Sequence, residues 1–242
     1  MAHGTQDAFQ TTPLDQVYVS TDIGELAARL QGKNVWDRRG NVTRISNFGC
    51  GLGAYTFIYY NNTSSYWLDM RHSLYGEPSV ALQAGLSTAY YSNIASYSSF
   101  PLSARVGIEY AFGYDSLDSV IWLQLVVDTG TEELTGAIYV EGLTWKLYYL
   151  NSGGTYSYSG YITPLAYSGW QPNFIKLVID TVTKKYLRVI INSLSISLSS
   201  ISLYVESSTL VPMMCGTFGI YGKAVSLSTA YVYHIIHTIN EL

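Results

Sequence analysis

Acidic residues are the first side chains in this sequence to test for catalytic spacing. Hydrolysis by a paired acid and nucleophile needs two carboxylates on one face of the fold. In a β-strand, residues i and i+2 share a face, whereas i and i+1 or i+3 do not. The nearest candidates are adjacent, three residues apart or isolated: Glu132 and Glu133, Asp115 and Asp118, Glu109, and Glu141. We interpret them as solvated carboxylates in turns, and no catalytic pair is predicted.

The remaining reactive residues lead to the same prediction. His234 and His237 are three apart on an expected strand, which places them on opposite faces and prevents joint metal binding. The sequence contains no P-loop, no Cys-x-x-Cys pair and no recognisable Ser-His-Asp set. We therefore predict that the protein is not an enzyme and needs no cofactor, with calcium left as an option.

Calcium is considered because oxygen-rich loops suit this ion. Three aspartates near expected strand ends are weak candidate ligands: Asp115, Asp118 and Asp128. The commoner role of such residues is to hold turns by accepting backbone hydrogen bonds. Both interpretations stay open at the level of sequence.

Aromatic side chains could form a binding site, because their faces offer flat apolar area with polar rims. Four tryptophans could stack on sugar rings: Trp67, Trp122, Trp145 and Trp170. Most strand aromatics pack between sheets instead. Tyr156 and Tyr158 lie in the turn-like segment 151–160, which is expected to be an exposed loop, and tyrosine is also common in protein interfaces. The candidates for contact with a glycan or a protein are Tyr156, Tyr158, Trp67 and Trp145.

The elements that position these residues are mainly strands. Residues 175, 177 and 179 are apolar and share one face, and the polar segment 180–185 separates them from a returning strand. Strands are expected near 55–60, 65–71, 79–83, 104–114, 119–128, 134–140, 144–150, 161–165, 173–180, 185–192, 194–198, 201–205, 216–222 and 229–238. Many short strands with brief turns favour an all-β fold, a two-sheet antiparallel jelly-roll sandwich over residues 46–242.

Residues 1–45 differ from this pattern and are predicted to form an N-terminal arm with one short helix. Asp22 and Glu25 have the spacing of a capping box, and Leu26 and Leu30 lie one helical turn apart. A helix this short is marginal in water, so its apolar face must dock on another surface. We expect Leu26 and Leu30 to contact a second subunit and to support a homo-oligomer.

Composition limits the possible partners. Charged residues make up 12% of the chain and the net charge is −4, so neither nucleic acid nor a membrane surface is an expected partner. The first 20 residues lack the features of a secretory signal, and no apolar run could span a membrane. Cytoplasmic synthesis is expected. Cys50 and Cys215 could form a disulfide or remain two buried thiols.

The order of the segments "RVGIEYAFGY", "VIWLQLVVD", "FIKLVIDTVTKKYLRVIIN" and "TAYVYHIIHTI" resembles the concanavalin A-like, laminin G-like jelly roll. The front end, "ELAARL" followed by "WDRRGNV", is similar to that of uncharacterised bacterial and phage-encoded proteins. The front-end resemblance implies a role on a phage-like virion or particle. Together with the arm, the low charge, the absent secretory signal and the missing catalytic set, it leads us to expect a non-enzymatic structural or decoration protein on the particle surface, in contact with other particle proteins. The alternative is a carbohydrate-binding, lectin-like module, including one that attaches to host glycans.

Overall fold

The computed structural model shows an all-β protein. It describes residues 40–46, 48, 51–59, 64–74, 77–87, 89–98, 103–116, 119–162, 165–166, 168–222 and 227–241. The strands are β1 (Asn41–Ser46), β2 (Thr56–Tyr59), β3 (Ser65–Leu74), β4 (Glu77–Ala84), β5 (Tyr91–Ser98), β6 (Arg105–Tyr114), β7 (Val120–Asp128), β8 (Glu132–Glu141), β9 (Lys146–Leu150), β10 (Tyr156–Tyr161), β11 (Ser168–Asp180), β12 (Lys185–Ile191), β13 (Leu194–Ser197), β14 (Tyr204–Ser207), β15 (Met213–Tyr221) and β16 (Ser228–Ile239).

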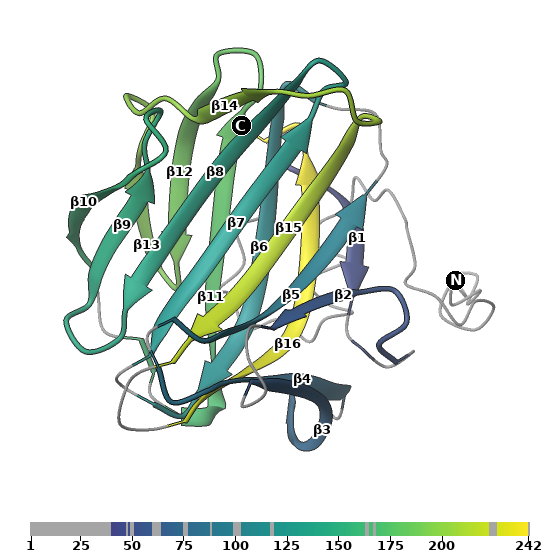
Figure 1. Ribbon diagram of the computed structural model, residues 1–242, viewed down its shortest axis with the longest axis vertical. Helices are drawn as coiled ribbons and strands as arrows, with labels where there is room; N and C mark the ends of the chain where they lie inside the picture. Colours follow the sequence, from purple (N-terminus) through teal and green to yellow (C-terminus); the bar gives the residue numbers. More distant parts are fainter. Residues whose placement is uncertain are drawn as a thin grey trace, which may run out of the picture.

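The strands form two antiparallel sheets packed face to face (Figure 1). The front sheet, nearest the viewer in Figure 1, has the order β10-β9-β8-β7-β15-β5-β2, and β14 also pairs with β8. The back sheet has the order β13-β12-β11-β6-β16-β4-β3, and β1 also pairs with β16. This arrangement confirms the predicted all-β fold class, a two-sheet antiparallel jelly-roll sandwich.

The core lies between the two sheets and follows the alternation seen in the sequence. Ile175, Leu177 and Ile179 on β11 are all buried in it, as predicted. The sheets are tightly packed at Gly216 on β15, where a Cβ atom would lie 2.3 Å from Cδ1 of Ile108 on β6. A glycine is therefore needed at this position so that the side chain of Ile108 can occupy the space.

Two sequence-based assignments are wrong. Residues 91–98 carry no predicted strand, yet they form β5. Its inward face combines the core residue Ile94 with serines, two of which form hydrogen bonds there. Ser96 Oγ lies 3.1 Å from Nε2 of His237, and Ser92 Oγ donates to the Ser65 carbonyl. The expected exposed loop 151–160 is only partly a loop, since β10 begins at Tyr156 and pairs with β9. Alternation of apolar and polar residues cannot reveal a strand whose buried side is polar.

A buried group of charges fastens the end of the described chain to the back sheet. The Glu241 carboxylate accepts from Lys176 Nζ at 2.7 Å, from Arg188 Nη2 at 2.5 Å and from Thr238 Oγ1 at 2.5 Å. The side chains of Glu241, Lys176 and Arg188 are 0%, 2% and 8% exposed. Gly107 leaves room for the carboxylate, because a Cβ there would lie 3.1 Å from Glu241 Oε1.

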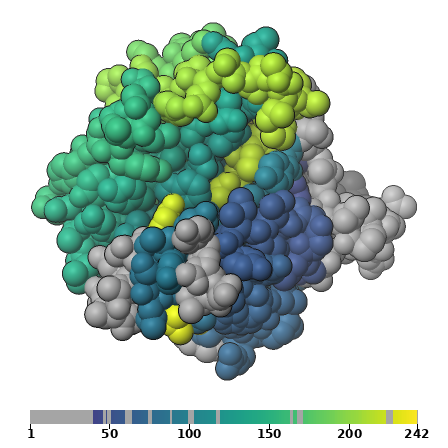
Figure 2. Space-filling view, viewed as in Figure 1, coloured from purple at the N-terminus to yellow at the C-terminus, as the bar shows by residue number. Residues whose placement is uncertain are grey.

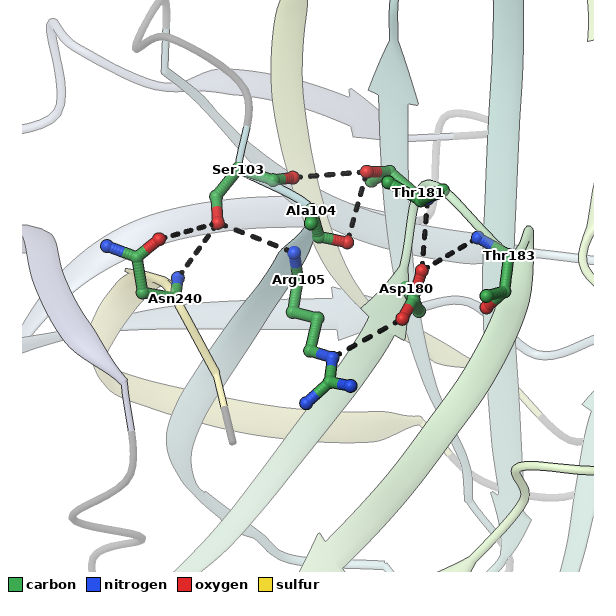
Figure 3. A network of polar contacts seen from close by, with 8 residues as sticks. Ser103, Ala104, Arg105, Asp180, Thr181, Thr183 and Asn240 are labelled. Carbon is green, nitrogen blue, oxygen red and sulfur yellow. Dashed lines mark hydrogen bonds and ion pairs between the residues drawn. The ribbon is translucent and has the colours of Figure 1, made fainter.

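A second polar network joins the ends of three back-sheet strands (Figure 3). Arg105 Nε donates to Asp180 Oδ2 at 3.3 Å, linking β6 to β11. Ser103 Oγ donates to Asn240 Oδ1 at 2.8 Å and accepts from the Asn240 amide at 3.1 Å. Thr181 Oγ1 donates to the carbonyl of Ser103 at 3.1 Å. These bonds fix the chain where it enters β6 and leaves β11 and β16.

The predicted N-terminal helix, with Leu26 and Leu30, lies outside the described residues, and so does most of the proposed arm 1–45. The described part of the arm includes β1, which pairs with β16 and so belongs to the back sheet. Among the described residues, no helix has the length and apolar character needed to cross a membrane.

Candidate functional site

A band of aromatic side chains crosses the outer face of the front sheet. The strand register places Trp122 on β7 opposite Tyr139 on β8, Tyr139 opposite Tyr148 on β9, and Tyr148 opposite Tyr158 on β10. Four rings thus lie in one row across four strands. This row and the neighbouring aromatic residues Tyr91, Tyr156, Tyr161 and Tyr221 are called the aromatic band below. Figure 2 views this face from the front, with β8 to β10 forming its teal to green part.

The rings of the aromatic band support one another. Tyr139 and Tyr148 are stacked, with ring centroids 4.4 Å apart and an interplanar angle of 16°. Tyr156 stands edge-on to Tyr139 at 4.8 Å, and Tyr158 edge-on to Tyr148 at 5.7 Å. The Trp122 indole N–H donates to Tyr156 Oη at 2.7 Å. Because these contacts already hold the rings in place, the aromatic side chains would lose little conformational entropy when a ligand binds.

A pocket of about 270 Å³ opens within the band. Its walls come from β7, β8, β10 and β15 and the residue after β15, and they combine four aromatic rings with one carboxylate: Val120, Trp122, Tyr139, Glu141, Tyr156, Tyr221 and Gly222. Trp122 and Tyr221 meet edge to face, with centroids 6.3 Å apart and an angle of 84°. Rings at such angles form walls instead of a flat platform. The pocket can therefore enclose a compact group.

Electrostatics keep the tyrosines of the pocket neutral. Burial raises the pKa of Tyr221 to about 12, and the phenols of Tyr156 and Tyr91 act in the same direction. Burial also raises the pKa of Tyr139, and the Tyr148 phenol and the Glu141 carboxylate add to this shift. These phenols stay protonated at neutral pH. They can serve as apolar surfaces and hydrogen-bond donors, but not as ready bases.

The structure places the four predicted contact residues in three different surroundings. Tyr156 lines the pocket, and Tyr158, 48% exposed, lies in the aromatic band. Trp145 is half-buried and packs on the main core, while Trp67 packs on a small apolar cluster of the back sheet with Phe174. The two tyrosines are thus brought together with the pocket, and the two tryptophans are not.

Two members of the site, Tyr139 and Tyr221, were missed in the sequence, and a third, Glu141, was considered only as an isolated carboxylate. Tyr139 and Glu141 are two residues apart on β8, so they share its outward face. Tyr221 reaches the same place from β15, because it lies opposite Val120, which in turn lies opposite Glu141. The spacing on β8 was a visible signal. The contribution of β15 depends on strand order, which the sequence does not display.

The candidate calcium ligands do not converge among the described residues. Asp115 accepts hydrogen bonds from the Thr229 amide at 2.9 Å and from the Tyr231 hydroxyl at 3.4 Å. Asp128 is fully buried and accepts from the Gly130 amide at 2.7 Å and from the Ser208 hydroxyl. Asp118 lies outside the described residues. In the part of the chain that the structure describes, no three His, Cys, Asp or Glu side chains are grouped to hold a metal ion.

The two isolated carboxylates lie in different sheets, and one of the two cysteines is described by the structure. Glu109 lies buried opposite Lys176 in the back sheet, whereas Glu141 lies in the front-sheet pocket, so the two are in different sheets. Cys215 is a buried free thiol, whose pKa burial raises. Cys50 lies outside the described residues.

Comparison with known proteins shows that solved structures share this fold. No family model and no curated protein sequence matches the chain. Among solved structures, an endo-beta-1,4-glucuronan lyase from the fungus Trichoderma reesei has a TM-score of 0.55 and 8% identity, covering 75% of this chain and 90% of that one. The cellulose induced protein Cip1 has a TM-score of 0.53 and 11% identity, covering 80% and 96%.

A sialidase is similar over 80% of this chain, with a TM-score of 0.50 and 9% identity, and this chain spans 18% of its length. At such low identities the likeness shows the fold alone. The fold is thus one shared with carbohydrate-active proteins, as the names of the lyase and the sialidase indicate. The predicted relatives with the "ELAARL" and "DRRG" front end are not among these structures, and of those residues only Gly40 lies in the described part of the chain.

The prediction that the protein is not an enzyme is contradicted by this comparison, because the similar structures include a glucuronan lyase and a sialidase. The sequence argument tested for a pair of carboxylates on one strand and for a few short catalytic and metal-binding motifs. It did not consider side chains that meet across strands. Tyr139 and Glu141 on β8 and Tyr221 on β15 show that different strands of this sheet do bring polar groups together.

Proposed function

We propose that this protein binds a carbohydrate chain on the outer face of its front sheet, along the aromatic band. The observation that carries the proposal is the pocket of about 270 Å³, walled by four aromatic rings and set among further exposed tyrosines. The similarity of fold to carbohydrate-active proteins supports it. The alternative function predicted from the sequence, a lectin-like module, is also carbohydrate binding.

The physical basis is the match between rings and sugars. A pyranose ring has an apolar face of C–H groups and a polar rim of hydroxyls, and an aromatic side chain with a polar tip complements both. Trp122 supplies the largest ring in the pocket, and the phenols of Tyr139 and Tyr221 supply hydrogen-bond donors at its edge. The pocket is smaller than the range of roughly 300–1,000 Å³ usual for drug-sized ligands. It therefore suits a single sugar residue, with the rest of the chain lying along the band.

The test is a glycan array followed by titration calorimetry of the bound glycans. Trp122→Ala and Tyr139→Ala should each weaken binding about tenfold or more, which corresponds to about 1.4 kcal/mol. Tyr59→Ala is the matched control, since Tyr59 is an exposed tyrosine on β2, at the far edge of the same sheet. Chromatography of each bound glycan after incubation will show whether the protein also cleaves it.

Failure of the wild-type protein to bind any glycan would refute the proposal. Equal losses in the Tyr59 control and the pocket variants would refute the assignment to the aromatic band. Assembly on a phage-like particle, the other role expected from the sequence, stays a prediction, as does the homo-oligomer, because no described residue tests either one.

A further inference from the structure

Glu141 provides the only formal charge among the described residues that line the pocket. From this combination of one carboxylate and four aromatic rings we infer that the pocket takes a positively charged amino group. The preferred ligand is then a carbohydrate that contains amino sugars, such as an oligomer of glucosamine. The inference rests on the proposed function and names the ligand class of the same site.

The carboxylate is oriented toward the site and is available for binding. Thr144 Oγ1 donates to Glu141 Oε2 at 2.6 Å, which fixes the side chain from the turn after β8. Among the described residues, Glu141 Oε1 accepts no hydrogen bond. Lys146 lies opposite Glu141 in the register, yet no ion pair within 4.0 Å joins these two side chains in the described part of the chain. The negative charge is thus left to attract a ligand.

The aromatic walls favour the same kind of group. A cation within about 6 Å of a ring centroid is attracted by the negative face of the ring, and tryptophan is the best of the aromatic residues for this contact. Trp122 and Tyr221 meet at 84°, and Tyr139 and Tyr156 meet at 63°, so the rings surround the pocket from several directions. An ammonium group can meet ring surfaces and the carboxylate at once. A neutral hydroxyl gains only the hydrogen bond.

Anionic sugars are disfavoured by the distribution of arginine. Recognition of a carboxylate in protein sites commonly uses the two-pronged hydrogen bonds of a guanidinium group. All described arginines belong to strands of the back sheet: Arg44, Arg71, Arg105 and Arg188. A uronate in the pocket would meet Glu141 without a guanidinium partner. The glucuronan named for the similar lyase is therefore not the expected ligand of this face.

The experiment compares three oligosaccharides of equal length by calorimetry in weakly acidic buffer, where amines are protonated. They are a glucosamine tetramer, its N-acetylated form, which has the same backbone without the charge, and a glucuronate tetramer. The glucosamine tetramer should bind the wild-type protein about tenfold more tightly than the N-acetylated form, as expected for one charge-assisted contact. The glucuronate tetramer should bind most weakly.

Variants test whether Glu141 sets this preference. Glu141→Gln keeps the shape of the side chain and should bring the affinity ratio of glucosamine to N-acetylglucosamine oligomers close to one. Lys146→Gln should raise the ratio, because it removes the competing cation. Glu133→Gln is the matched control. It removes a carboxylate from the same face of β8, eight residues and roughly 26 Å away, and should preserve the ratio.

The outcomes separate this inference from the proposed function. Equal binding of the two glucosamine forms, or tightest binding of the glucuronate oligomer, overturns the inference while the carbohydrate-binding proposal stands. No binding of any glycan here or on the array overturns both. A preference for glucosamine that survives in Glu141→Gln, or vanishes in Glu133→Gln, refutes the assignment of the charge-binding role to Glu141.

Discussion

Replacing Glu241 by glutamine should destabilise the protein severely, although the residue is remote from the aromatic band. The carboxylate is fully buried and neutralises two cations, Lys176 and Arg188, that are themselves almost completely buried. Removing one partner of a buried ion pair costs about 3–5 kcal/mol, because the remaining charge is left uncompensated. Glu109 lies opposite Lys176 and still offers a negative charge, so the lower part of this range is expected.

Urea denaturation followed by tryptophan fluorescence measures this effect. A loss of about 3 kcal/mol is a large share of the roughly 5–15 kcal/mol by which folded proteins are stable. The matched control is Glu132→Gln, which breaks the ion pair of Glu132 with Lys184 at 2.7 Å, where the side chains are 39% and 43% exposed. Exposed pairs contribute about 0–1 kcal/mol. If the two variants lose equal stability, or if Glu241→Gln loses less than the control, the reasoning about burial is wrong.

Three further variants test other contacts. Burial alone would raise the pKa of Asp180, but hydrogen bonds from Thr183 and Arg105 outweigh it, so the pKa is lowered in the folded state. The ionised Asp180 therefore stabilises the fold above the unfolded pKa of about 3.8, and this contribution is lost as pH falls through the folded pKa. Asp180→Asn should therefore lower the melting temperature at neutral pH and weaken its acid dependence, and an unchanged pH profile would contradict this. Gly216→Ala should cost about 1–3 kcal/mol in thermal unfolding, because the new methyl group overlaps Ile108; an unchanged melting temperature would show that the sheets yield easily. Tyr156→Phe removes the acceptor of the Trp122 indole N–H and should shift the tryptophan fluorescence of the pocket, whereas an identical spectrum would mean that this bond does not order the ring.

The fold was largely predictable because most buried faces alternate along the sequence. Ile175, Leu177 and Ile179 reveal β11 at once, since each second residue must be apolar to enter the core. β5 could not be found in this way, because Ser92 and Ser96 satisfy their hydroxyls inside the molecule. A strand with polar inward residues is stabilised by partners that only the folded structure supplies.

The candidate site was less predictable, because it depends on which strands become neighbours. Tyr156 and Tyr158 were selected as exposed aromatics, and both lie in the aromatic band. Glu141 was set aside because it has no acidic neighbour within its strand. In the structure its neighbours are Val120 and Lys146 on the adjacent strands, and Tyr221 lies one strand further. Pairing across the sheet is decided by the whole fold and leaves no local trace.

The position of β16 has a consequence for folding during synthesis on the ribosome. This strand lies between β6 and β4 in the middle of the back sheet, and Val232 pairs with Val80. At translation rates of about 5–20 residues per second, roughly 8–30 s separate the synthesis of these two residues. Throughout that interval β3 and β4 emerge with one edge unpaired and part of their apolar surface uncovered. A nascent chain of this protein must therefore be shielded, by chaperones or by its own earlier strands, until its final long strand has been made.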